Sequence, residues 1–210
     1  MHRMSHWSVP YFYRYFKSFL YFRQNREKPW LTKEVNELLG CWIRKSDIGF
    51  EWGSGSSTYW FAQKAKFITS IEHNPEWHKI VNKKITDKSI AHKVKLNLLP
   101  EQKTPPQEEE YVQIIKKIKD NTLDFCLVDG ILRDQCALAS LQKIKKGGIL
   151  VIDDIQRYFP DTINTKAPYA RREGDGYQSK TWQKVGKMTD GWRQIRFSNG
   201  LKDTGIFFKP

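Results

Sequence analysis

The residues in this 210-residue chain with the clearest chemical potential surround a run of small residues, Glu51-Trp52-Gly53-Ser54-Gly55-Ser56-Ser57. An apolar stretch ends here on a carboxylate and is followed by two glycines, where a simple turn needs one. Glycines at such a point let backbone N–H groups and a helix N-terminus approach a ligand closely. The carboxylate would repel a phosphate but would favour an ammonium or a sulfonium. The segment therefore predicts a site for a small cationic ligand.

A second carboxylate, Glu72, ends the next apolar stretch, 21 residues after Glu51. At that position in an α/β sheet a carboxylate can accept both hydroxyls of a ribose. The chain has no GxxxxGK[ST], which excludes a P-loop, and Thr58 stands where a dinucleotide loop has its third glycine. S-adenosylmethionine (SAM) carries adenosine, an ammonium and a sulfonium but no phosphate. SAM is therefore the ligand we expect.

Alternating strands and helices must position these residues. We expect strands at 47–52, 67–72, 92–99, 122–130 and 147–154, with helices at 57–66, after Asn74-Pro75, around 114–118 and at 133–146. Apolar strands separated by helices indicate parallel pairing with helices on both faces. After a polar loop at 156–180 and a short helix at 181–187, an Asn-Gly turn between two strands predicts a hairpin. The fold class is α/β: a Rossmann-like, doubly wound, seven-stranded, mostly parallel sheet with an antiparallel C-terminal hairpin and N-terminal helices.

Four motifs in this framework resemble one known family. "EWGSGSS" is similar to motif I of class I SAM-dependent methyltransferases, and "SIEHN" to the acidic motif that follows it. "FCLVDG" resembles the fourth-strand motif of that family, and "KKGGILVIDD" resembles its fifth strand. The resemblance covers residues 47–155 and 192–209. It implies methyl transfer from SAM, for which we expect a hydroxyl of a small or medium-sized substrate as the acceptor.

The resemblance also implies the domain layout and the roles of individual residues. Residues 1–46 would form an N-terminal helical cap on a SAM-dependent methyltransferase domain at 47–210, within a single compact unit. Asp129 would lie beside the transferable methyl and orient or deprotonate the acceptor, with Asp153 as a second catalytic candidate. The cofactor-binding residues would be Glu51, Gly53, Ser54, Gly55, Ser57, Thr58, Glu72, His73, Asn97 and Asp129.

Three carboxylates at strand ends raise the question of a metal. Asp129, Asp153 and Asp154 match positions at which the metal-dependent O-methyltransferases hold a divalent cation, and oxygen ligands suit Mg²⁺. Asp154 departs from that branch, which usually has Asn there. The alternative is that Asp129 orients ligands by hydrogen bonding while Asp153 and Asp154 begin a loop. Both alternatives stay open at this point.

The net charge of +13 bears on partners. Residues 1–49 carry nine basic and four acidic side chains and residues 156–210 carry eleven and five, whereas 50–155 are nearly balanced. We expect a small-molecule or glycan acceptor, with an anionic acceptor favoured by the basic flanks and by Arg171-Arg172 in the 156–180 loop. One alternative is a nucleic-acid methyltransferase, although "VDGI" lacks the [DN]-P-P-[FYW] pattern typical of base-amino methyltransferases. Another is a non-catalytic SAM-fold protein on an anionic surface.

The N-terminal segment and the cysteines indicate a location. Residues 8–26 predict a helix with an aromatic face, for which core packing and peripheral membrane contact are the two interpretations. Arg14 and Lys17 interrupt its apolar run, so we expect no signal peptide, and no apolar stretch is long enough to span a membrane. Three cysteines without a CxxC pattern suit a reducing compartment. We expect a cytoplasmic protein, with peripheral membrane association as the alternative.

Overall fold

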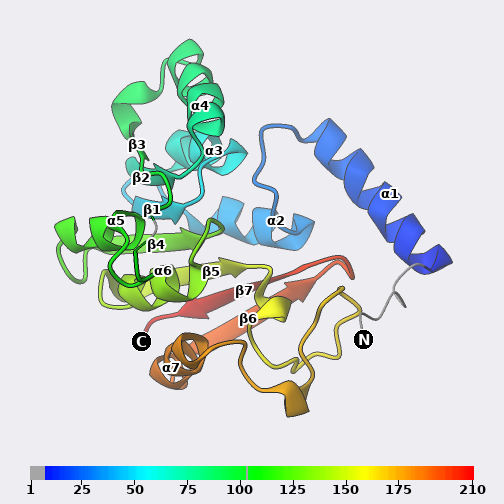
Figure 1. Ribbon diagram of the computed structural model, residues 1–210. Coiled ribbons are helices and arrows are strands. Elements are labelled where there is room, and N and C mark those ends of the chain that lie inside the picture. Colours follow the sequence, from blue (N-terminus) through cyan, green and yellow to red (C-terminus); the bar gives the residue numbers. More distant parts are fainter. Residues whose placement is uncertain (1–7, 103) are drawn as a thin grey trace.

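The structure is a computed structural model, and it describes residues 8–102 and 104–210. Seven strands form one sheet in the order β3-β2-β1-β4-β5-β7-β6 (Figure 1). Their bounds are β1 (Ile48–Trp52), β2 (Phe67–Glu72), β3 (Val94–Leu98), β4 (Leu123–Val128), β5 (Ile144–Asp153), β6 (Arg193–Ser198) and β7 (Asp203–Phe208). Within this sheet β7 runs antiparallel to both β5 and β6, while the first five strands are parallel. The predicted fold class is confirmed.

Helices cover both faces of the sheet (Figure 1). Alternate residues along the central strands enter two separate buried clusters, as expected for a sheet that is buried on both sides. One cluster includes α2 (Lys33–Trp42) and α3 (Ser56–Lys64), and the other includes α5 (Glu110–Gln113), α6 (Arg133–Ser140) and α7 (Lys180–Met188). α4 (Pro75–Asp87) follows β2, and the Asn74 side chain caps it by accepting hydrogen bonds from the N–H groups of Glu76 and Trp77.

The two N-terminal helices differ in how they meet the body. α2 places Val35 and Leu39 in the sheet's core, together with Leu31 just before the helix. Ser8 caps α1 (Val9–Gln24) through its hydroxyl, which accepts a hydrogen bond from the Tyr11 N–H, and none of the helix residues is buried. It lies at the side of the molecule, apart from the sheet (Figure 1). A division of the chain at residue 46 stays a prediction.

Two predicted elements were wrong in extent. The helix expected over 133–146 ends at Ser140, and residues 144–146 belong to β5 because Ile144 is fully buried and pairs with Leu123. The Gly-Gly pair therefore lies inside a strand at an irregularity in its pairing. A Cβ on Gly148 would come within 2.7 Å of the Ile144 side chain and 2.8 Å of the Asp124 carbonyl oxygen. The helix expected near 114–118 is the four-residue α5 followed by a 3-10 turn at Ile114–Lys117.

Candidate functional site

The glycine loop lies between the carboxyl ends of β2 and β4. The Gly53 N–H donates to the Ile71 carbonyl at 2.8 Å, and the Asp129 N–H donates to the Trp52 carbonyl at 2.9 Å. Gly53 has φ +89°, and a Cβ there would be 2.8 Å from the Asp129 carbonyl oxygen. Both facts require glycine at this position. The loop, Glu51, Glu72 and Asp129 are thus brought to one edge of the sheet, the edge at which open α/β sheets bind ligands.

Glu51 is fully buried beneath this loop, in register with Ser70 of β2 and Leu127 of β4. Burial raises its pKa from 4.5 to about 7, although nearby hydroxyls of Thr58, Ser70 and Ser57 act to lower it. Within the described part of the chain, neither carboxylate oxygen accepts a hydrogen bond of good geometry. A buried carboxylate without a donor is costly. The Glu51 carboxylate is therefore available to accept hydrogen bonds from a ligand at the start of α3.

Glu72 is also buried, but its oxygens are already used. One oxygen accepts from the Ser54 N–H at 3.0 Å and from the Ser54 hydroxyl at 2.8 Å. The other accepts from the N–H groups of His73 at 3.0 Å and Asn74 at 2.8 Å. The carboxylate fastens the glycine loop to the end of β2 and fixes the turn into α4. A ribose would have to replace the Ser54 hydroxyl, which can rotate away.

At the start of α3 the buried Thr58 supports the glycine loop, while the exposed Trp77 of α4 lies beside it. Thr58 is fully buried; its hydroxyl accepts from the Gly55 N–H at 3.0 Å and lies 3.3 Å from the Ser70 hydroxyl. Thr58 thus holds the loop from behind. Trp77 of α4 donates its indole N–H to the Ser54 carbonyl at 2.7 Å and stays 41% exposed. Its ring therefore forms one rim of the loop.

His73 and Asn97 lie differently from each other relative to the loop. The His73 ring is partly exposed, directly after Glu72, and stands edge-on to the Tyr111 ring with centroids 6.2 Å apart. Asn97 pairs with Ile71, one residue before the strand end, and its amide donates to the carbonyls of Ser70 and Lys95. Leu98, rather than Asn97, is the residue opposite Glu72.

Asp129 is held by Arg133 at the start of α6. One Arg133 terminal nitrogen lies 2.9 Å from the Asp129 carboxylate, and its Nε donates to the Gly130 carbonyl at 2.9 Å. The other terminal nitrogen donates to the Asp153 carbonyl at 2.8 Å and lies 3.8 Å from the Asp154 carboxylate. Burial, followed by the nearby Asp153 charge, raises the pKa of Asp129, while Arg133 opposes the rise. The Asp129 side chain remains 30% exposed and accessible to a second molecule.

Asp153 is committed to the fold. Its side chain is almost fully buried, with one oxygen accepting from the Thr204 hydroxyl at 2.7 Å and the other from the Lys202 ammonium at 2.8 Å. Burial alone would lower the pKa of Lys202, but Asp153 and Asp129 raise it above its ordinary value. Lys202 also donates to the Trp30 carbonyl, which ties the segment between α1 and α2 to this edge.

The predicted Mg²⁺ site is not supported. Arg133 and Lys202 supply the positive charge that a metal would supply to Asp129, Asp153 and Asp154. Among residues 8–102 and 104–210, no group of three or more His, Cys, Asp or Glu side chains could hold a metal ion. The three carboxylates do converge, but onto side-chain cations: Arg133 and Lys202, with Arg157 also 3.8 Å from Asp154.

Several residues of this edge were missed from the sequence. Arg133 had a signal, because it follows Asp129 by four residues and opens the next helix. Lys202 and Tyr111 had none. The Tyr111 hydroxyl is buried, and a Cβ on Gly130 would be only 2.0 Å from it. Gly130 leaves the room that this hydroxyl occupies beneath Asp129.

The arginines of the long loop bind the loop to itself. Arg171 donates to the carbonyls of Gly176 at 2.7 Å and Asp175 at 2.6 Å, and Arg172 lies 3.4 Å from the Asp161 carboxylate. Nothing in these contacts presents the pair to a ligand.

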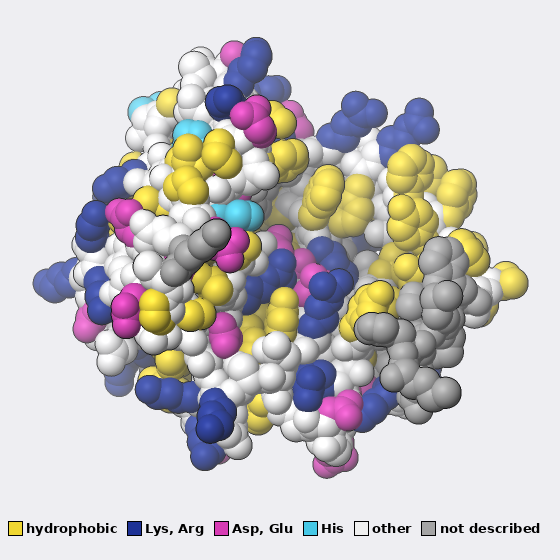
Figure 2. Space-filling view, in the orientation of Figure 1, with side chains coloured by type: hydrophobic (Ala, Val, Ile, Leu, Met, Phe, Trp, Pro, Cys, Tyr) yellow, Lys and Arg dark blue, Asp and Glu magenta, His cyan; other side chains and the backbone are white. Residues whose placement is uncertain are grey.

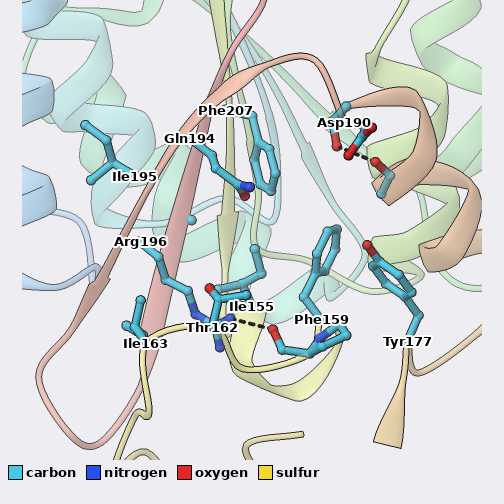
Figure 3. A pocket seen from close by; sticks show the side chains of 14 residues that line it. Ile155, Phe159, Thr162, Ile163, Tyr177, Asp190, Gln194, Ile195, Arg196 and Phe207 are labelled. Carbon is cyan, nitrogen blue, oxygen red and sulfur yellow. Dashed lines mark hydrogen bonds between the residues drawn. The ribbon is translucent and has the colours of Figure 1, made fainter. Parts of the chain in front are cut away.

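A separate cavity of about 310 Å³ lies under the start of the same loop, between α7 and the β6–β7 hairpin (Figure 3). Phe159, Tyr177 and Phe207 form its apolar walls, and Gln194 and Arg196 reach it from β6 (Figure 3). Arg196 is already paired with the buried Asp203 at 3.0 Å. None of the residues that line this cavity belongs to the glycine loop, and Glu51, Glu72 and Asp129 do not line it either.

In the space-filling view a recess opens between α4 and α1, and basic and acidic side chains lie together in it (Figure 2).

Comparison with known proteins found no matching family model and no matching curated protein. Solved structures do match over most of their length. The chain has the fold of class I SAM-dependent methyltransferases.

Three of these structures illustrate the range. A candidate caffeoyl-CoA O-methyltransferase from Staphylococcus aureus matches with TM-score 0.60 at 15% identity, over 92% of this chain and 91% of that one. The O-methyltransferase TomG from Streptomyces achromogenes, involved in tomaymycin synthesis and solved with SAM, gives 0.59 at 14%, over 86% and 82%. An rRNA methylase from Streptococcus thermophilus gives 0.53 at 11%, over 82% and 92%. This methyltransferase fold is thus shared by proteins with quite different acceptors.

Proposed function

We propose that this chain binds SAM at the glycine-loop edge and transfers its methyl group to a hydroxyl of a small or medium-sized substrate. One observation carries the SAM proposal: Glu51 is fully buried beside the N-terminus of α3, and although three hydroxyls lie near it, neither of its oxygens accepts a well-aligned hydrogen bond from the described residues. An ammonium group provides both the positive charge and the N–H donors that Glu51 lacks. A phosphate would instead be repelled.

The residues present fit SAM in the following way. Glu51 and the 53–55 backbone would hold its amino-acid portion, with Ser57 beside them. Glu72 would take the ribose after its Ser54 hydroxyl partner rotates, and His73 and Trp77 would border the adenine. Thr58 would support the loop from behind. Bound SAM would supply an electrophilic methyl group.

Asp129 is the residue proposed to act on the acceptor. It is partly exposed, and its pKa is raised toward the range in which a carboxylate can accept a proton near neutral pH. Arg133 fixes its position through the 2.9 Å ion pair. Asp129 would orient the acceptor hydroxyl and accept its proton. We give Asp153 no part in proton transfer, because Thr204 and Lys202 occupy both of its oxygens.

A nucleic-acid acceptor is the second candidate. The net charge of +13 favours it, and rRNA methylases share the fold at a TM-score above 0.5. Against it, Asp129 is followed by Gly130 and Ile131, which offer no aromatic platform for a flipped base.

Calorimetric titration of SAM into the protein tests the cofactor. We expect binding by the wild type, clear weakening in Glu51→Gln, and no change in the matched control Glu76→Gln, whose carboxylate is exposed on α4. Absence of SAM binding to the folded wild type would contradict the proposal.

Transfer of a radiolabelled methyl group to a panel of phenols, sugars and tRNA tests the acceptor. Labelling of a hydroxyl compound, lost in Asp129→Asn, supports the proposal. Labelling of tRNA alone would establish the second candidate instead.

A further inference from the structure

The outer side of α1 carries an apolar face. Val9, Tyr13, Phe16 and Leu20 follow one another at helical spacing, and their exposed fractions are 84%, 63%, 59% and 38%. An exposed face of this size on a soluble domain marks an interaction site. The face belongs to no part of the glycine-loop edge.

Contacts on the opposite side of the helix fix this orientation. The Arg14 side chain packs over Gly200 in the β6–β7 turn, where a Cβ would be 2.7 Å from Arg14 Cδ. Near the C-terminal end, the Tyr21 hydroxyl accepts from the Asn36 amide of α2 at 3.5 Å. α1 is therefore held by one side, and tertiary structure turns its apolar face outward.

The charge around this face indicates what covers it. Residues 8–26 contain Arg14, Lys17, Arg23 and Arg26 and no acidic residue. Lys17 and Arg23 are exposed. We propose that α1 docks the protein onto an anionic lipid bilayer. Aromatic side chains would enter the headgroup region while the basic side chains meet lipid phosphates and carboxylates.

Two further observations favour a bilayer over other occupants. A second copy of the chain would bring two acid-free basic helices together, and like charges would oppose that pairing. In the described residues no helix is long and apolar enough to cross a membrane, so the contact would be at the surface. The proposal does not depend on methyl transfer.

α4 provides a matched control surface. It is also basic and exposes Ile80 to 57%, but Lys79 pairs with Glu76 at 2.9 Å and Lys83 with Asp87 at 2.8 Å. Its charge is partly neutralised within the helix. A polar substitution at Ile80 therefore tests whether the loss of any exposed apolar residue would weaken binding.

Co-sedimentation of the full chain with vesicles tests the proposal. We expect binding to vesicles that contain about 30% phosphatidylserine in phosphatidylcholine, because phosphatidylserine makes the surface anionic. Binding to vesicles of pure phosphatidylcholine should be weak, and high salt should abolish binding to the anionic vesicles. Phe16→Ser/Leu20→Ser should weaken binding roughly tenfold or more. Lys17→Glu/Arg23→Glu should weaken it about 25-fold or more, because each basic residue contributes about fivefold.

Ile80→Ser and the charge-matched Lys184→Glu/Lys187→Glu on α7, both lysines being exposed, should bind vesicles like the wild type. Unchanged thermal denaturation would show that the α1 variants are folded. If one of the two double variants of α1 does not fold, the other still tests the proposal, because it changes different side chains. Equal binding by all variants would overturn the proposal. A wild-type dimer that dissociates in Phe16→Ser/Leu20→Ser would also overturn it. So would a wild type that binds tRNA and not vesicles, with tRNA binding weakened only by Lys17→Glu/Arg23→Glu.

Discussion

The buried Glu51 carboxylate leads to a prediction about stability whose sign is unusual for an acidic residue. Burial raises its pKa from 4.5 to about 7. Because one pKa unit corresponds to about 1.4 kcal/mol, keeping Glu51 ionised in the SAM-free protein costs about 3 kcal/mol. Between pH 4.5 and 7 the folded chain keeps a proton that the unfolded chain has released. The free energy of unfolding therefore falls as pH rises through this window.

Glu51→Gln removes the charge while nearly keeping the shape of the side chain. We expect the variant and the wild type to have similar free energies of unfolding near pH 4.5. The variant should become progressively more stable than the wild type, by up to about 3 kcal/mol at pH 8. Urea unfolding of SAM-free protein at pH 5, 6, 7 and 8 measures the difference. SAM affinity should change in the opposite direction, because the variant loses the charge that would meet the ammonium.

Glu72→Gln is the matched control, because it is the same substitution at a second buried carboxylate of the same edge. Glu72 accepts four hydrogen bonds, three of them from backbone N–H groups, which an amide nitrogen cannot accept. The Glu72→Gln variant should therefore have a free energy of unfolding about 1–3 kcal/mol below that of the wild type. A Glu51→Gln protein that is less stable than the wild type at pH 8, or a difference that does not vary with pH, would refute the reasoning about burial.

Three further predictions concern the same edge. Gly53→Ala should lower the free energy of unfolding by about 1–3 kcal/mol, because Gly53 has φ +89° and the added Cβ would be 2.8 Å from the Asp129 carbonyl oxygen. In Gly55→Ala the added Cβ would have no contact closer than 3.9 Å, so thermal denaturation of this control should be unchanged. Asp129→Asn should lower turnover by roughly a hundredfold or more while SAM affinity measured by calorimetry stays near the wild type; an equal loss in both would give Asp129 to the cofactor alone. Exhaustive treatment with EDTA should leave turnover unchanged, because Arg133 and Lys202 already pair with Asp129 and Asp153; recovery by Mg²⁺ after a loss would contradict this.

The sequence by itself determined the elements and their order. Apolar runs separated by helical patterns specify parallel strands, and the Asn-Gly turn specifies the hairpin, because these signals are local. The structure confirms the strands, and it places Glu51, Glu72 and Asp129 at strand ends as predicted. Prediction failed where local pattern and burial disagree: Lys145 and Lys146 were expected at the end of a helix, but the burial of Ile144 begins the strand three residues before the two glycines.

The tertiary structure alone decided which of the polar side chains are available to a ligand. Glu51 and Glu72 look equivalent in the sequence, yet Glu51 is buried without a well-aligned donor among the described residues, whereas Glu72 accepts hydrogen bonds from three backbone N–H groups. Lys202 reaches Asp153 across 49 residues of chain, and no local pattern encodes such a contact. Whether a carboxylate meets a cation, an amide or a ligand depends on which residues the folded chain brings within hydrogen-bonding distance. That choice belongs to three-dimensional packing, because the sequence places these groups far apart.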